Sequence, residues 1–251
     1  MRLLVPGLIA IACVLLAAPA FAAEGSLVGD ALSDLSALTS DPQKLTPAFR
    51  LAILVTLLSL APALVMMLTC FVRVVVVLSL LRQAIGVQQV PPNQVLVALS
   101  LFITLFVMQP TFDSAYAHGI GPYLRGDVAD AAAFESTVAP FRGFMLRQTR
   151  EEDLKLFEDI SDRELPESPD QVGLTLLLPA YMLSELRTAF LIGFMLFLPF
   201  LVIDMVVAST LLSMGMIVVP PIIISLPIKL MIFVLVDGWN LVIGALVRGV
   251  L

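Results

Sequence analysis

Residues 189–214, AFLIGFMLFLPFLVIDMVVASTLLSM, are the stretch of this sequence that decides its fold. The run is 26 residues long and holds a single charge, Asp204. A helix of about 20 apolar residues is long enough to cross the hydrocarbon core of a bilayer, which is about 30 Å thick. The run therefore predicts a membrane-crossing helix.

Three further apolar runs of similar length lie at residues 51–72, 95–116 and 222–247. Of the 251 residues, 59% are hydrophobic and 14% are charged, whereas a soluble domain has about 45–50% apolar and about 25% charged residues. This composition argues against a soluble globular enzyme and against a disordered chain. We expect an all-α fold: membrane-associated helical hairpins built from four long apolar segments, with an acidic, partly helical periplasmic region.

Residues 1–22 have the pattern of a secretory signal peptide. Arg2 supplies the positive start, residues 3–18 the apolar region, and Ala20-Phe21-Ala22 a cleavage site of small residues. An uncleaved first membrane helix is the alternative interpretation.

A secreted amino terminus sets the orientation of the rest. Residues 23–50 are then periplasmic, and residues 51–116 form a first hairpin whose loop, with Arg73 and Arg82, is cytoplasmic, as the positive-inside rule requires. Residues 117–184 form an acidic periplasmic region, and residues 185–251 form a second hairpin with a pore-proximal loop.

The acidic region contains an amphipathic pattern. Apolar residues recur at helical spacing between Pro140 and Ile160, and Pro166 and Pro169 follow. Such a helix either packs on its own chain or presents a docking face to another subunit.

The apolar runs carry charges, prolines and small residues that a simple lipid anchor does not need. Each run has a proline within or beside it, and Ala189-x-x-x-Gly193 is a spacing that lets two helices approach closely. Asp204, Lys229 and Asp237 are expensive in a bilayer unless they are paired. We therefore expect these helices to pack on other protein.

Folding the last hairpin between Met216 and Ile217 places Asp204 level with Lys229, and Glu185 level with Arg248. Two pairs of opposite charge at matched depth predict a neutralising ladder, within one chain or between subunits.

The tip of this hairpin is rich in methionine. Met214-Gly215-Met216 precedes Ile217, Val218 and two prolines, which predicts an apolar, flexible turn. Methionine adapts to irregular surroundings. These four apolar side chains (Met214, Met216, Ile217 and Val218) either fill a core or form a deformable seal around a passing chain.

Several long, ungapped blocks resemble one family. They are FVRVVVVLSLLRQAIG (71–86), PPNQVL (91–96), SELRTAFLIGF (184–194), PFLVIDMVVA (199–208), SMGM (213–216), SLPIKL (225–230) and FVLVDGW (233–239). Together they closely resemble the FliP/SctR proteins of type III secretion export gates, and the cleaved signal is more similar to the flagellar branch.

This resemblance implies a non-enzymatic core subunit without cofactor or metal. It implies that several copies assemble with FliQ- and FliR-like subunits in the bacterial inner membrane, within the flagellar basal body, with a large periplasm-facing part. Unfolded flagellar export substrates would pass through the pore, and the hairpins would be lifted toward the periplasm in the finished gate. It places the pore seal at Met216 and suits Glu185 and Lys229 to pairing between subunits.

Two other classes of function fit some of the residues. An intramembrane aspartyl protease would use Asp204 and Asp237, although the motifs typical of such enzymes are absent. An ion-coupled transporter would use the buried charges as a relay. The net charge of −6 gives no basic surface for nucleic acid, and His118 has no ligand partners at metal-binding spacing.

Overall fold

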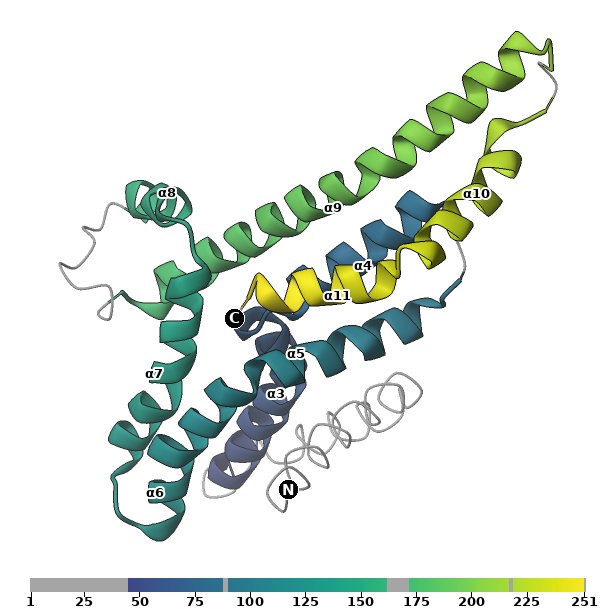
Figure 1. The fold of residues 1–251 in the computed structure, drawn as a ribbon. Helices are drawn as coiled ribbons and strands as arrows, with labels where there is room; N and C mark the ends of the chain where they lie inside the picture. Colours follow the sequence, from purple (N-terminus) through teal and green to yellow (C-terminus); the bar gives the residue numbers. More distant parts are fainter. Residues whose placement is uncertain (1–44, 88–89, 162–171, 217–218, 251) are drawn as a thin grey trace. The chain divides into compact units, whose positions relative to one another are not determined.

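The computed structural model describes residues 45–87, 90–161, 172–216 and 219–250. The predicted signal peptide and residues 23–44 lie outside them. All regular elements in the described ranges are helices, so the all-α prediction is confirmed (Figure 1). They are α3 (Leu45–Leu68), α4 (Phe71–Ile85), α5 (Asn93–Ala115), the π-helical turn η1 (Tyr116–Ile120), α6 (Gly121–Arg125), α7 (Asp130–Gln148), α8 (Glu151–Ser161), α9 (Leu174–Ser213), α10 (Pro221–Leu235) and α11 (Gly238–Arg248).

The chain divides into two compact units, residues 1–65 and 66–251. The described part of the first unit belongs to α3, which coincides with most of the predicted run 51–72. The second unit holds the hydrophobic core, and the account below concerns that unit.

The number of predicted membrane segments is only partly supported. Within the described ranges, two helices are long and apolar enough to cross a membrane: Asn93–Arg125, which continues α5 through η1 and α6, and Leu174–Ser213. A third would be α10 together with α11, but this pair is bent by 64°. By length and composition, the described residues thus contain two helices that could cross a membrane, or three if α10 and α11 count as one span. The four predicted membrane segments are not confirmed.

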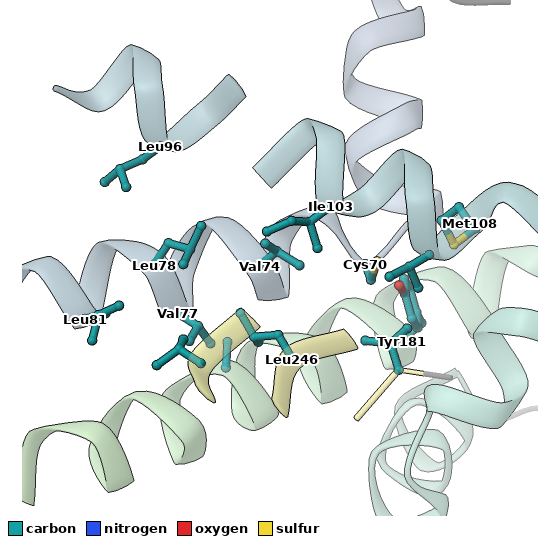
Figure 2. Close-up of a cluster of buried hydrophobic side chains, with 14 of the residues drawn as sticks. Cys70, Val74, Val77, Leu78, Leu81, Leu96, Ile103, Met108, Tyr181 and Leu246 are labelled. Atoms are coloured by element: carbon teal, nitrogen blue, oxygen red, sulfur yellow. The ribbon is translucent and has the colours of Figure 1, made fainter. Parts of the chain in front are cut away.

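The centre of the core is a helix where the sequence suggested a loop. Arg73 and Arg82 were expected in a cytoplasmic loop, but both belong to α4. Val74, Val77 and Leu78 of this helix are almost completely buried (Figure 2). Buried residues recur three and four positions apart along α4, which gives it one continuous apolar face. This face contacts α9 and α5, so α4 holds the unit together.

Small residues allow α4 and α9 to approach closely. Ala189 is fully buried. A Cβ atom built on Gly193 would lie 3.1 Å from Cβ of Leu80, which is tighter than nine in ten real contacts of this kind. Arg73 faces Glu185 and Leu80 faces Gly193, so the two helices run parallel. The close approach expected from Ala189-x-x-x-Gly193 is confirmed.

The amphipathic stretch of the acidic region is two helices rather than one. α7 ends at Gln148 and α8 begins at Glu151. Phe144 and Met145 are buried in the core, and both helices contact α9. Phe144 and Met145 therefore pack on the same chain, whereas Ile160 at the end of α8 is exposed, so a docking face remains a prediction for that end.

We predict that Gly193→Ala destabilises the chain by about 1–3 kcal/mol, because the new methyl group would push α9 away from Leu80. Gly143→Ala is the matched control: its Cβ would meet only an arginine side-chain nitrogen at 3.7 Å, and alanine favours a helix interior by about 1 kcal/mol. Denaturant unfolding of the detergent-solubilised protein measures both. Equal stability of the two variants would contradict the close packing of α4 on α9.

Candidate functional site

Arg73 is the centre of a buried polar cluster. Its Nε donates to Oε2 of Glu185 at 2.8 Å, and its Nη2 donates to the other carboxylate oxygen. Nη2 also donates to Oε1 of Gln148 at 2.9 Å, and Nη1 donates to the carbonyl oxygen of Gly249 at 3.0 Å. The arginine side chain is 3% exposed and the glutamate side chain is 0% exposed. We call these four residues the Arg73 cluster.

This cluster is stable because each buried charge is satisfied. Removing a guanidinium and a carboxylate from water is costly, and only good geometry with additional hydrogen bonds offsets that cost. Arginine can supply them since its planar donors reach several acceptors at once. The cluster joins α4, the end of α7, α9 and the segment after α11, so four parts of the sequence meet at one charge.

The predicted pairing of Glu185 with Arg248 is wrong. Nε of Arg248 instead donates to the carbonyl oxygen of Gly244, on its own helix, at 3.0 Å. The prediction assumed one straight helix after the hairpin tip. Because the chain bends between α10 and α11, residues after the bend no longer lie level with the residues of α9 that the prediction matched to them. Sequence reasoning also missed Arg73. The available signal was its position on the apolar, valine-rich face of a helical pattern.

The other pair of the predicted ladder is present. Nζ of Lys229 lies 2.6 Å from Oδ2 of Asp204 and also donates to the carbonyl oxygen of Ala84 at 3.3 Å. The lysine side chain is 5% exposed, but the aspartate side chain is 44% exposed. The Oδ1 atom of Asp204 has no hydrogen-bond partner within the described chain. Asp204 thus neutralises Lys229 while part of its side chain stays exposed and its unpartnered Oδ1 is buried.

Asp237 was predicted to be a buried charge, but this chain does not bury it. It lies at the bend before α11 with a φ of 52°, and its Oδ2 accepts from Nδ2 of Asn240 at 3.1 Å. Asp204 and Asp237 are therefore held by different partners. This arrangement does not favour the shared proton that an aspartyl protease needs.

The end of α9 is capped rather than loose. Gly215 adopts a φ of 74°, and its N–H donates to the carbonyl oxygen of Leu212 at 3.0 Å. The N–H of Met216 donates to the carbonyl oxygen of Leu211 at 3.0 Å. These two bonds form a Schellman motif, in which glycine is favoured because it adopts positive φ without strain. The backbone therefore has a defined cap as far as Met216, and the flexibility of the turn stays a prediction.

The predicted seal residues are only partly described. Met214 and Met216 are exposed at the tip of the hairpin, while Ile217 and Val218 lie outside the described residues. The described part of the chain leaves the Met214 side chain largely exposed and the Met216 side chain partly exposed.

After Gly193, α9 continues beside α10, and the ends of the two helices project from the rest of the unit (Figure 1). We call residues 194–216 and 219–235 the α9–α10 arm. Many of its large apolar side chains are exposed: Phe194, Met195, Leu198, Leu201, Val202, Met205, Val206, Leu212, Ile222, Ile223, Met231, Val234 and Leu235. The Asp204–Lys229 pair lies in the middle of this apolar surface.

The arm's ion pair leads to an asymmetric prediction. Asp204→Ala should lower the unfolding free energy by about 2–3 kcal/mol, because it leaves the buried Lys229 ammonium without a carboxylate. Lys229→Met should cost less than about 1 kcal/mol, since the half-exposed Asp204 remains open to solvent. Denaturant unfolding of the isolated chain in detergent compares them. A larger loss for Lys229→Met would contradict this assignment of burial.

Comparison with known proteins shows the family to which the chain belongs. The model of the FliP family matches residues 54–246. The chain is 51% identical over 241 residues to the flagellar biosynthetic protein FliP of Caulobacter vibrioides, an alignment covering 96% of this chain and 88% of that protein. The corresponding protein of Bacillus subtilis is 45% identical over 210 residues, covering 84% of this chain and 95% of the relative. That of Aquifex aeolicus is 49% identical over 206 residues, covering 81% and 86%. The chain belongs to the FliP family.

Proposed function

We propose that this membrane-associated chain is a core subunit of the flagellar type III protein export gate. In this proposal several copies assemble with FliQ- and FliR-like subunits in the bacterial inner membrane and enclose a pore for unfolded flagellar proteins. Membership of the FliP family supports a role in flagellum biosynthesis. The pore, the partner subunits and the periplasm-facing part are proposed here in addition to that role.

The α9–α10 arm is the observation that carries the proposal. Soluble monomers rarely leave a contiguous apolar surface of this extent uncovered, so the arm must meet either lipid or protein. Asp204 distinguishes the two, because its side chain is 44% exposed within this apolar surface even though it pairs with Lys229. A carboxylate turned toward lipid at mid-membrane depth costs about 2.5–3.5 kcal/mol on insertion scales.

Neighbouring subunits would remove that cost. A second copy or a partner helix could cover the apolar side chains of the arm and the exposed part of the Asp204 side chain. Membrane helices associate through close packing, which an apolar surface of this kind allows. Asp237, which is exposed in the single chain, becomes a second candidate for an intersubunit contact.

The tip of the arm suits a role at the pore. The glycine cap fixes the end of α9, so Met214 and Met216 project from a defined point rather than from a mobile loop. Flexible thioether side chains on a rigid support can close around chains of different shape. We assign Met214, Met216, Ile217 and Val218 to a deformable apolar seal, which also excludes water when no substrate is present.

Gentle detergent extraction followed by mass measurement of the intact complex tests the assembly. The proposal predicts a particle containing several copies of this chain with FliQ- and FliR-like subunits. A monodisperse monomer without these partners would contradict the proposal.

The seal predicts a specific defect. Met216→Gly should make the assembled gate leak small solutes, because it removes an apolar side chain from the constriction, whereas Met216→Leu should leave it closed. Solute efflux from vesicles containing the assembled complex measures this difference. Unchanged permeability in the glycine variant, with normal assembly, would count against a sealing role.

A further inference from the structure

The bend between α10 and α11 interrupts a segment that is otherwise suited to be one helix. The two helices meet at 64° across Val236 and Asp237, and together they are apolar enough to cross a membrane. A continuous helix from Pro221 to Arg248 would be about 42 Å long, which exceeds the thickness of a bilayer core. Two arrangements of the same residues are therefore physically sensible.

The backbone at the bend adopts a conformation that is less favourable than a helical one. Asp237 has φ 52° and ψ 52°, the left-handed region that is costly for most L-residues and that Asp adopts more readily than most. It is the one non-glycine residue with positive φ among the described residues. Its side chain does not cap the backbone of the first turn of α11, but its Oδ2 accepts from Nδ2 of Asn240 in that turn at 3.1 Å, which offsets part of this cost. Such a conformation persists only where the surrounding contacts impose it.

One set of these contacts lies beside the bend. A Cβ atom on Gly238 would lie 2.8 Å from Cζ of Phe233, so this glycine is needed for the ring to pack against the backbone. The same ring makes an edge-to-face contact with Trp239, with the ring centroids 5.4 Å apart. Both contacts depend on α11 being turned back at Asp237.

A second set holds the far end of α11. Nη1 of Arg73 donates to the carbonyl oxygen of Gly249 at 3.0 Å, and Nε2 of Gln148 donates to that of Val250 at 2.8 Å. The Val250 residue is only 5% exposed. The last carbonyl groups of a helix lack partners within it, and a cation near them also interacts favourably with the helix dipole. The Arg73 cluster thus satisfies the end of α11 and holds it on the core.

We infer that α10 and α11 form a two-state element, with Asp237 as its hinge and the Gly249 and Val250 carbonyls as its latch. In the latched state, α11 lies on the core as observed. When the two carbonyl bonds are released, Asp237 returns to a helical conformation and α10 and α11 become one straight helix. This inference goes beyond the proposed pore function and concerns the single chain, so it does not depend on the assembly of a gate.

The hinge is tested by a distance along the segment. In the full chain with Cys13 and Cys70 changed to alanine, cysteines replace Ile223 and Ala245, both of which are exposed. A spin label is attached to each cysteine, and pulsed electron paramagnetic resonance measures the distance between the two labels. From the helical rise and the 64° bend, the two backbone sites are about 28 Å apart in the bent state and about 33 Å apart in the straight state.

Two substitutions of the hinge residue should move this distance differently. Asp237→Gly accepts positive φ freely and should keep the short distance. Asp237→Val is strongly disfavoured in the left-handed region and should lengthen the distance by about 5 Å. The hinge assignment is overturned if the valine variant keeps the short distance or if the glycine variant lengthens it.

The latch is tested separately, with Asp237 intact, in case the valine variant does not fold. Gln148→Glu keeps an acceptor for Arg73 but removes the donor to the Val250 carbonyl. A cysteine replacing Val250 should then react with a maleimide at least ten times faster than in the parent, while one replacing the exposed Leu241 should react equally in both. Equal protection of position 250 in the two backgrounds would refute a latching role for the hydrogen bond from Gln148 to the Val250 carbonyl.

Discussion

A guanidinium and a carboxylate that are both removed from solvent persist only when good geometry and additional hydrogen bonds offset the loss of water, and in the Arg73 cluster each guanidinium nitrogen and both carboxylate oxygens are hydrogen-bonded. Its partners come from three helices and from the segment after α11, so the cluster fixes the positions of distant parts of the sequence at once. The apolar face of α4 and the close approach at Gly193 then fill the space around it. The charge pair therefore determines which helices can surround α4.

The same constraint explains why the α9–α10 arm is uncovered. The first half of α9 is committed to α4, and its second half continues beyond the core with only α10 beside it. The arm's apolar side chains and its half-exposed Asp204 cannot be covered by the described part of this chain. High hydrophobicity thus has two separate uses here: a core around Arg73, and a surface that we assign to neighbouring subunits and lipid.

Periodicity, charge and spacing predicted much of this. The run at 189–214, the close contact at Ala189 and Gly193, and the pairing of Asp204 with Lys229 all depend on helical spacing or on a short hairpin, which are local properties. Arg73 and Glu185 could not be paired because they are 112 residues apart, and an arginine in an apolar sequence resembles a loop residue. The bend at Asp237 could not be predicted from the sequence either, because hydrogen bonds from Arg73 and Gln148, which are distant in sequence, hold the end of α11.

The most direct test of the central claim is a double-mutant cycle on Arg73 and Glu185, measured as the unfolding free energy of the chain in detergent. Each single replacement, Arg73→Met or Glu185→Leu, leaves one buried charge unpaired and should cost about 3–5 kcal/mol. The double variant should lose far less than the two single losses combined, because no unpaired charge remains. Purely additive losses would contradict the account that this ion pair organises the fold.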